Sequence, residues 1–301
     1  MKKIVSISLG SSKRDHNVNI IIKGQKINIR RIGTNGDVDK AIRLIRELDG
    51  KVDAFGMGGI SAFLYGKNRH AYFLRSALPI YKAAKKTPIV DGSGLKNSLE
   101  ASVVSYLKKG LGIPLESMKV FLVCGMERLG MAETFPALGS RMVYGDLMFA
   151  LGLPLPIKDL NNLHRIGSLL LPAIGRLPIR YLYPSGQGQE KIKPKFNRFY
   201  READIIAGDF LYIKKHMPES LKDKIIVTNT TTREDIELLR ERGSKMLVTT
   251  TPELDGRSFG TNVMEALVVA LLEKDLASIG PEDYQRVIRT DLFKPRVVYF
   301  N

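Results

Sequence analysis

The sequence is short of cysteine, of acidic side chains and of long apolar runs, and each shortage excludes a class of protein. Its single cysteine, Cys124, excludes an internal disulfide and a four-thiolate zinc site, and fits a reducing cytoplasm. No stretch reaches the roughly 20 uninterrupted apolar residues that a membrane-spanning helix needs. The first apolar run, of about six residues, is too short for a signal peptide and predicts a first β-strand. We therefore expect a cytoplasmic protein.

Histidine is also sparse, with four residues that stand apart and lack the spacing of metal ligands. No zinc or other metal site is expected from them. Cys124 itself, at the end of an apolar run beside a glycine, has two interpretations. It is a small buried hydrophobe, or a thiolate whose pKa is lowered by a helix N-terminus.

The shortage of acids leaves a strongly basic chain, with 47 Lys and Arg against 31 Asp and Glu and a formal net charge of +16. Residues 1–50 hold 11 basic against 5 acidic side chains, and residues 158–201 hold 9 against 2. Such a surface attracts nucleotide phosphates, acyl carriers, anionic lipid or nucleic acid. The alternative is a solvated surface without a specific partner. Nucleic acid is not expected, because no stacking motif or known module accompanies the charge.

Apolar strands alternate with helical periodicity along the chain, which indicates an α/β protein. Two stretches around Gly24-Gln25 alternate apolar and polar residues, as β-hairpins do. Further strands are expected at 4–9, 52–55, 88–90, 119–123, 141–144, 204–207, 224–228 and 245–249, and helices at 38–48, 75–85, 95–109, 129–138, 211–216, 233–242 and 261–273. The fold class is α/β, with a mixed α/β N-terminal domain and a doubly wound, Rossmann-like parallel-sheet domain.

This order of elements predicts three segments. Residues 1–112 are expected to form a substrate-side α/β domain, and residues 113–260 a dinucleotide-binding Rossmann-like domain. Residues 261–301 are expected to be C-terminal helices that return to the N-terminal domain. A basic helical insert, residues 157–195, interrupts the second domain.

The insert is amphipathic and is broken by Pro172 and Pro178, with a glycine-rich loop behind it. Its plainest interpretation is a packed helix with a solvated face. The alternatives are a lid over an acidic substrate, an oligomer contact, or a helix on a membrane surface through residues 157–184. We expect a homodimer and no membrane partner.

A glycine turn follows the apolar run at 119–123, in VFLVCGMERLGMAE. Gly125 stands where the strand ends, and Gly130 where the next helix can approach the strand. Amides at such a helix N-terminus attract phosphate. The middle glycine of the usual dinucleotide turn is missing, and Glu127 stands near its place.

Asp146 lies 21 residues beyond Gly125, directly after the next expected strand. A carboxylate there would accept a hydrogen bond from a ribose hydroxyl and repel a 2′-phosphate. The turn, the strand and the aspartate together predict a site for NAD rather than NADP. The alternative is a tight strand-to-helix turn followed by a helix-capping aspartate.

The segment TPIVDGSGLKNSLEA, residues 87–101, is similar to a known family. Its DGSG, which begins at Asp91, and its NSL, which begins at Asn97, resemble the interdomain pattern Asn-Thr-Asp-Gly-x-Gly and Asn-Ala-Leu of the shikimate/quinate 5-dehydrogenase family. The resemblance covers about residues 86–275 and continues through ADIIAGDF and IIVTNTTTREDIELLRERGSKMLVTTTPE.

The resemblance implies hydride transfer between NAD(P) and a cyclic hydroxy acid, a small anionic substrate bound in the interdomain cleft. Asp91 becomes the acid/base residue, which in that family pairs with a lysine at the substrate hydroxyl. The serine pair of SLGSSKRDHN matches the family's carboxylate-binding serines. The substrate-binding candidates are Ser11, Ser12, Asn97, Arg257 and Asn262.

Three features depart from the family. Its segment Asn-Val-Thr-x-Pro-x-Lys, which supplies the lysine, has no counterpart here. Its substrate-contacting glutamine is absent, and the glycine turn is degraded. The alternative function is a non-catalytic protein that binds a nucleotide or another phosphorylated ligand on a degenerate dehydrogenase scaffold. The lysines available to replace the missing one are Lys67, Lys82, Lys85 and Lys86.

Overall fold

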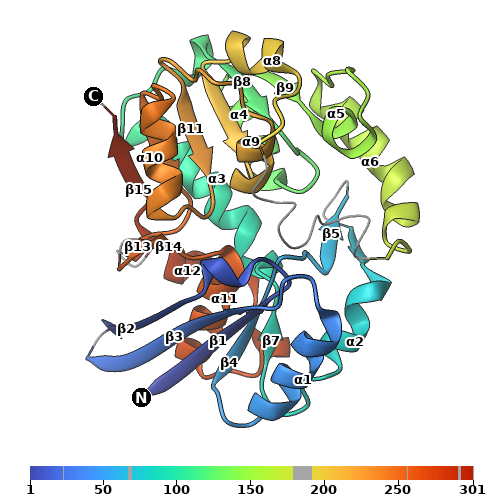
Figure 1. The fold of residues 1–301 in the computed structure, drawn as a ribbon, viewed down its shortest axis with the longest axis vertical. Coiled ribbons are helices and arrows are strands. Elements are labelled where there is room, and N and C mark those ends of the chain that lie inside the picture. The colour runs from blue at the N-terminus through green and yellow to red at the C-terminus, as the bar shows by residue number, and fades with distance from the viewer. Residues whose placement is uncertain (23, 67–69, 179–191, 256, 291–292, 301) are drawn as a thin grey trace.

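Two parallel sheets, each with its own helices, organise the chain into two α/β domains (Figure 1). The computed structural model describes all residues except 23, 67–69, 179–191, 256, 291–292 and 301. Most of the glycine-rich end of the expected insert, and Lys67, lie outside the described residues. The α/β fold class expected from the sequence, a mixed domain followed by a doubly wound one, is confirmed.

The first domain has a five-stranded sheet of order β2-β3-β1-β4-β7. Its strands are β1 (Lys2–Ser8), β2 (His16–Ile22), β3 (Gln25–Gly33), β4 (Ala54–Gly58) and β7 (Ile89–Val90). All neighbours run parallel except β2, which pairs antiparallel with β3 as the hairpin pattern predicted. The turn between them includes Gly24, whose φ of 79° suits glycine.

Helices cover both faces of this sheet. They are α1 (Val38–Leu48), the 3-10 helix η3 (Arg75–Ala77), α2 (Leu78–Tyr81), α3 (Ser93–Lys109), α11 (Thr261–Leu272) and α12 (Pro281–Ile288). Alternate residues of β1 serve the two faces, as the strand period requires. Val5 and Ile7 pack with α1 and α2, whereas Ile4 packs with α11 and α12. The domain also holds η1 (Ser12–Arg14), η6 (Leu276–Ser278) and a hairpin of β5 (Phe63–Tyr65) and β6 (Ala71–Phe73).

The second domain has a six-stranded sheet of order β15-β12-β11-β10-β8-β9. Its strands are β8 (Lys119–Leu122), β9 (Arg141–Tyr144), β10 (Ile205–Gly208), β11 (Ile225–Thr228), β12 (Met246–Thr249) and β15 (Arg296–Tyr299). All neighbours are parallel except β15, which pairs antiparallel with β12. β10, β11 and β12 are buried along their whole length, as their continuous apolar runs predicted.

The second sheet is also covered on both faces, by two cores that divide its strand residues. The covering helices are α4 (Leu129–Ala137), α5 (Asp146–Leu151), α6 (Leu160–Ile174), α8 (Asn197–Glu202), α9 (Phe210–His216) and α10 (Arg233–Glu241). Shorter elements are η4 (Leu115–Ser117) and the hairpin of β13 (Glu253–Leu254) and β14 (Arg257–Ser258).

The described part of the basic insert is a packed helix. α6 buries Leu163 in the core beside β8 and β9. Its C-terminal end reaches the first domain, where the Arg75 amide donates to the Gly175 carbonyl at 3.0 Å and the Ser76 hydroxyl donates to the Leu177 carbonyl at 3.0 Å. α6 therefore joins the two domains along one side (Figure 1).

The boundary between the two domains lies within helix α3, earlier in the chain than the expected residue 112. The first half of α3 contributes Leu95 and Leu99 to the core of the first domain. Its second half contributes Val103 and Leu107 to the core of the second. The boundary therefore falls within the helix, because one apolar stripe along it serves both cores.

The C-terminal segment returns to the first domain only in part. α11 and α12 pack there as expected. The chain then adds β15 to the second sheet, which differs from the expectation of helices alone over 261–301. β15 covers the edge of β12, whose backbone would otherwise lack partners. Val297 and Val298 pack into the cores on opposite faces of that sheet.

Both sheets have a switch point, at which the chain order reverses. In the first sheet β3 and β4 lie on opposite sides of β1, and in the second β9 and β10 lie on opposite sides of β8. Ligands of open α/β sheets bind beyond the carboxyl ends of strands at such points. The two switch points open into the same space between the domains.

A substitution at Gly130 can test how closely α4 packs on α3. A Cβ built on Gly130 would lie 2.7 Å from the Glu100 Cβ and 3.0 Å from the Asn97 Cα. Alanine is favoured over glycine within a helix by about 0.5–1 kcal/mol, so a loss of stability reports the clash. We expect Gly130→Ala to destabilise the protein by about 1–3 kcal/mol, the usual cost of overpacking, measured as a lower urea midpoint. Gly280→Ala, where an added Cβ meets nothing within 4 Å, is the control. An unchanged midpoint for the Gly130 variant would contradict this contact.

Candidate functional site

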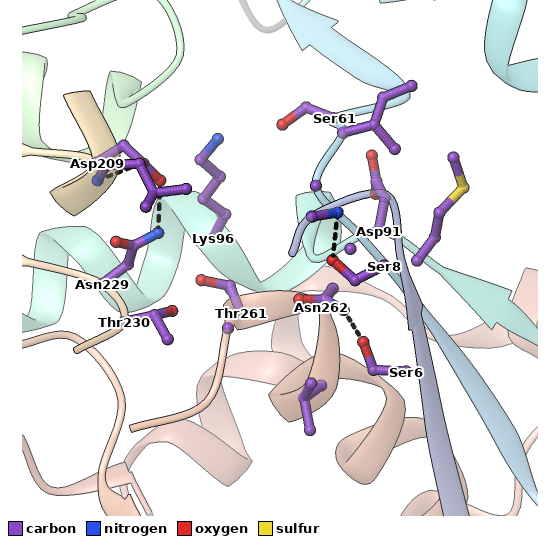
Figure 2. A pocket seen from close by; sticks show the side chains of 18 of the residues that line it. Ser6, Ser8, Ser61, Asp91, Lys96, Asp209, Asn229, Thr230, Thr261 and Asn262 are labelled. Atoms are coloured by element: carbon purple, nitrogen blue, oxygen red, sulfur yellow. Dashed lines mark hydrogen bonds between the residues drawn. The ribbon is translucent and has the colours of Figure 1, made fainter. Parts of the chain in front are cut away.

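A cleft lies between the domains at the carboxyl ends of both sheets (Figure 2). The first domain supplies the ends of β1 and β4 and the turn between β7 and α3. The second supplies the loops that follow β8, β10 and β11. Thr261 and Asn262, at the start of α11, lie between the two walls in Figure 2.

Serines of β1 form part of the first wall. Ser6 and Ser8 are two residues apart, so both point to the same face of the strand. The Ser6 hydroxyl accepts a hydrogen bond from the Asn262 amide nitrogen at 2.9 Å. The Ser8 hydroxyl accepts from the Gly10 amide at 3.1 Å and from Arg31 Nη2 at 2.9 Å.

Glycines allow α11 to approach this wall. A Cβ on Gly56 in β4 would lie 2.7 Å from the Asn262 carbonyl oxygen. A Cβ on Gly92 would lie 2.7 Å from the Asn262 amide nitrogen, and the φ of Gly92, 95°, also favours glycine. The GMGG and DGSG stretches therefore bring the first turn of α11 into the cleft.

The predicted acid/base residue lines the cleft, with its oxygens engaged by backbone. Asp91 Oδ2 accepts from the amides of Ala62 at 2.6 Å and Phe63 at 3.2 Å, and Oδ1 accepts from the Ser93 amide at 3.0 Å. Asp91 thus joins the turn after β7 to the strand that follows β4.

Lys96 is a cationic residue of the cleft that the sequence analysis did not single out. It stands on the first turn of α3, within the same DGSGLKN stretch, and its Nζ lies 3.9 Å from Glu127 Oε1. Its position five residues after Asp91, on a helix that begins at the turn, was the available signal. Lys82, Lys85 and Lys86 are not among the lining residues.

A buried arginine anchors the second wall. Arg128 Nη1 lies 2.9 Å from Glu100 Oε1 of α3, and Nη2 lies 2.8 Å from Asp209 Oδ2, just after β10. Burial alone would lower the pKa of Arg128, but Glu100 and Asp209 together raise it above its ordinary value. The guanidinium therefore stays charged and links three elements.

Asp209 is held as an anion in this group. Burial would raise its pKa, but Arg128, the Asn229 side chain, the Leu211 amide and Arg14 together bring the pKa of Asp209 below its ordinary value. Asn229 Nδ2 donates to Asp209 Oδ2 at 2.8 Å. Asn229 and Asp209 point toward each other in Figure 2, on the side of the cleft that Lys96 also reaches.

The predicted phosphate turn is bound to the predicted ribose ligand. The Gly125 and Met126 amides both donate to the Asp146 carboxylate at 2.9 Å. Burial raises the pKa of Asp146 to about 6, and the two amides oppose that rise. Asp146 is not among the residues that line the cleft. Burial, reinforced by the charge of Asp146, also raises the pKa of Cys124, which favours the interpretation of Cys124 as a small buried hydrophobe.

Helix α6 covers the same turn. A Cβ on Gly125 would lie 2.8 Å from a methyl carbon of Leu163 and 2.8 Å from the Tyr144 ring. Gly167 packs directly on the Met126 side chain. Leu163 of α6 and Tyr144 therefore pack directly against the backbone of this turn.

The other predicted residues divide between the cleft and the surrounding structure. Asn262 lines the cleft. Ser11 and Ser12 instead fix the loop after β1, with the Ser11 hydroxyl accepting from the Lys13 amide at 3.2 Å and the Ser12 hydroxyl accepting from Asn35 Nδ2 at 3.0 Å. The β1 serines that line the cleft are thus Ser6 and Ser8, whereas the sequence analysis predicted Ser11 and Ser12.

Two further predicted residues, Asn97 and Gly130, are not among the described lining residues, and the cleft does not test a third, Arg257. Asn97 lies on α3 against Gly130 of α4, so the glycine that was expected to approach a strand approaches a helix. Arg257 lies in β14, pairs with Leu254, and has a side chain outside what the structure describes. Neither Asn97 nor Gly130 is a lining residue.

Charge in the described lining favours an anion. Asp91, one of its three carboxylates, is held by backbone amides rather than by a cation. The twelve-residue helix α11 also directs its N-terminus at the cleft, and its first residue follows Gly260 without a side-chain cap. The cationic lining residues are Arg14, Arg31, Lys96, Arg128 and Lys215, and the carboxylates are Asp91, Glu127 and Asp209.

A second buried carboxyl group lies behind the turn of Asp91. Glu265 of α11 accepts from the Tyr284 hydroxyl at 2.8 Å and from the Gly94 amide at 3.1 Å. Burial, reinforced by Asp91, raises the pKa of Glu265 to about 8, and these hydrogen bonds only partly oppose the rise. Glu265 is therefore protonated at neutral pH.

Metal and membrane motifs are not found in the described part of the chain. It holds no group of three or more His, Cys, Asp or Glu side chains placed to bind a metal ion. Among the helices it contains, none combines the length and the apolar character of a bilayer-crossing segment.

The cleft, the two switch points and the two sheets define a two-domain α/β protein with a polar cleft between its domains. Residues 94–300 match the family model described as "Domain of unknown function (DUF8754)", and residues 3–91 match "Domain of unknown function (DUF8753)". The first match covers more than half of the chain, which therefore belongs to the DUF8754 family. The two matches meet at the turn that carries Asp91. None of the curated proteins matches the chain in sequence.

Solved structures match the chain only at low similarity. A galactofuranose binding protein is 12% identical, with 99% of this chain and 95% of that chain covered and a TM-score of 0.39. The hetero-hexameric glutamate dehydrogenase from Thermus thermophilus in its Leu-bound form is 14% identical, with 95% and 71% covered and a TM-score of 0.41. A malic enzyme is 13% identical, with 82% and 65% covered and a TM-score of 0.32. At these values none of the three bears on what this chain binds.

Replacing Arg128 should lower the free energy of unfolding, because it leaves a buried carboxylate without its cation. Arg128→Met leaves Glu100 buried without its partner, so we expect a loss of about 3–5 kcal/mol in the free energy of unfolding, measured by urea denaturation. Glu100→Gln in the same chain should restore part of that loss, because it removes the unpaired charge. Equal stability of Arg128→Met and the double variant would contradict this coupling.

Glu265 should make stability depend on pH. Its pKa is about 8 in the folded protein against an ordinary 4.5, so the folded state binds more protons between these values and stability falls as pH rises through that window. Glu265→Gln removes this dependence, and the variant should gain stability relative to the parent from pH 5 to pH 8 in urea titrations.

Glu273→Gln is the matched control for this measurement. Its hydrogen bond and charge contact with Lys2 lower the pKa of Glu273 below its ordinary value. That variant should show no gain relative to the parent between pH 5 and pH 8. A Glu265 variant that tracks the parent across the window would refute the buried protonated carboxyl group.

Proposed function

We propose that the protein is a non-catalytic binding protein that holds a small, anionic, hydroxyl-rich ligand between its two domains. The observation that carries the proposal is the turn after β8. Its Gly125 and Met126 amides are engaged by Asp146, and Leu163 of α6 lies over it. The place of a dinucleotide is thus filled, while the cleft beside it is lined by polar groups.

The chemistry of the lining suits such a ligand. Hydroxyl and amide side chains both donate and accept, so they can bind the hydroxyl groups of a sugar or polyol. The excess of cationic side chains and the start of α11 favour a negative charge. The neutral polar side chains of the lining are Ser6, Ser8, Ser61, Tyr212, Asn229, Thr230, Thr261 and Asn262.

The placement of Asp91 also supports binding rather than catalysis. A general base needs an oxygen within hydrogen-bond reach of the proton it removes. Both oxygens of Asp91 accept from the backbone, at Ala62, Phe63 and Ser93. In this proposal Asp91 shapes the cleft by holding the turn after β7, and Lys96 attracts the ligand's charge.

A second candidate is the NAD-dependent oxidoreductase of the shikimate/quinate dehydrogenase type. One observation favours it, because Asp91 and Lys96 line the same cleft as an acid/base pair would. NAD would then lie at Gly125 and Asp146. Binding there requires Asp146 to release two amides and α6 to leave Gly125, which the first proposal does not require.

A panel of small ligands separates the two functions. We expect gluconate or glucose 6-phosphate, but not NADH or NADPH, to raise the Tm of the full chain in thermal unfolding. A ligand at 100 times its Kd adds about 2.7 kcal/mol, which corresponds to a shift of several degrees. Lys96→Gln should reduce the shift because it removes a charge from the cleft.

Lys109→Gln, an exposed lysine at the far end of the same helix, is the matched control and should leave the shift intact. Micromolar NADH binding, followed by nicotinamide fluorescence and weakened by Asp146→Asn, would overturn the binding-protein proposal and favour the dehydrogenase.

A further inference from the structure

Two arginines of the first domain lie close together on the wall of the cleft. Arg31 of β3 donates from Nη2 to the Ser8 hydroxyl at 2.9 Å and from Nη1 to the Ser11 carbonyl at 3.0 Å. Arg14, at the end of η1, donates from Nη2 to the Thr230 carbonyl of the second domain at 3.4 Å. Both arginines are lining residues.

The two guanidinium groups act on each other. Burial and the nearby charge of Arg14 together lower the pKa of Arg31 to about 10, although Asp15 opposes both effects. Arg14 also acts on Asp209 across the cleft. It therefore stands between the walls, with a like charge on one side.

Two carboxylates contact this pair. Asp15 lies 2.9 Å from Arg31 Nη1 and its side chain is 38% exposed. Asp235 lies 3.5 Å from Arg14 Nη2 but 2.7 Å from Lys214, so its closer partner is the lysine. Both arginines therefore keep a cationic character at the wall of the cleft that they line.

A phosphoryl group suits this pair better than a carboxylate. It carries a charge of about −1.5 to −2 at neutral pH and offers three terminal oxygens, whereas a carboxylate carries one charge and two oxygens. Each guanidinium presents paired N–H donors that fit phosphate oxygens. The uncapped N-terminus of α11, at Thr261 and Asn262, adds a third favourable group in the same cleft.

We propose that Arg14 and Arg31 form a phosphoryl subsite, so that the ligand of the cleft is a phosphate monoester of a polyol or sugar. The subsite rests on the proposed function. The hydroxyl side chains that share the cleft, among them Ser6, Ser61 and Thr230, bind the ester's hydroxyl groups. This separates an ester from free phosphate, which would use the arginines alone.

Isothermal titration of the full chain with inorganic phosphate, glucose 6-phosphate, gluconate and glucose tests the subsite. We expect glucose 6-phosphate to bind more tightly than inorganic phosphate, and both more tightly than glucose. Arg31→Gln and Arg14→Gln should each weaken glucose 6-phosphate binding by about tenfold or more, because each removes charged hydrogen bonds. Gluconate binding should change much less.

Arg30→Gln is the matched control, since Arg30 neighbours Arg31 on β3, is exposed and is not a lining residue. It should leave all affinities within about twofold, below the energy of one charged hydrogen bond. Arg31→Lys keeps the charge but loses the planar fork. It should weaken the phosphate ligands even if Arg31→Gln fails to fold.

The outcomes separate the subsite from the proposed function. Gluconate or glucose binding with no preference for phosphate, or phosphate binding that neither arginine variant weakens, overturns the subsite and leaves the binding cleft intact. Equal affinity for inorganic phosphate and glucose 6-phosphate overturns the ester. Failure of every probe to bind overturns both proposals.

Discussion

The buried guanidinium of Arg128 is the interaction on which the cleft depends. It ties Glu100, in the helix that passes from one domain to the other, to Asp209, at the end of β10. Because Arg128 itself closes the turn after β8, one side chain fixes three of the elements that meet at the switch point of the second sheet. A buried charge of this kind is stable only when every partner stays in place. The loop positions around the cleft are thus set by an internal ion group and do not wait for a ligand to order them.

The second domain has the sequence pattern of a dinucleotide-binding domain, but its contacts differ from those that the pattern predicts. The strand, the glycine turn and the aspartate after the next strand are all present in the expected order. Asp146, however, accepts hydrogen bonds from the turn amides, and α6 packs over the turn at Gly125. Residues that follow β8, β10 and β11 instead line the space between the two domains.

Sequence patterns were sufficient for the fold because its signals are local. Continuous apolar runs such as Ile225–Thr228 specify buried parallel strands, and the alternation around Gly24 specifies a hairpin. β15 was missed because a short strand near the end of a chain is defined by the edge it covers, here β12, which lies about 50 residues earlier. Helix α3 was found, but its division between two cores is a property of packing.

The site was predictable to a smaller extent. Asp91 and Asn262 line the cleft, as the resemblance to the shikimate/quinate 5-dehydrogenase family implied, whereas Lys96 was not singled out. Ser6 and Ser8 were missed in favour of a later serine pair, because the face of β1 that meets the cleft is decided by where α11 packs. The pairing of Asp146 with Gly125 joins residues that follow two different strands, β9 and β8. No spacing rule distinguishes a carboxylate that binds a neighbouring loop from one that binds a ribose.

Helix α3 contains the boundary between the domains and also couples their two cores. Leu95 and Leu107, on one continuous helix, belong to different cores, so neither domain can lose its structure without removing support from the other. α6 makes a second tie along another side through Gly175 and Leu177. Two connections along different sides oppose a hinge motion that would separate the walls. On the proposed function, a ligand would enter a cleft whose width is set largely by the packing of α3 and α6.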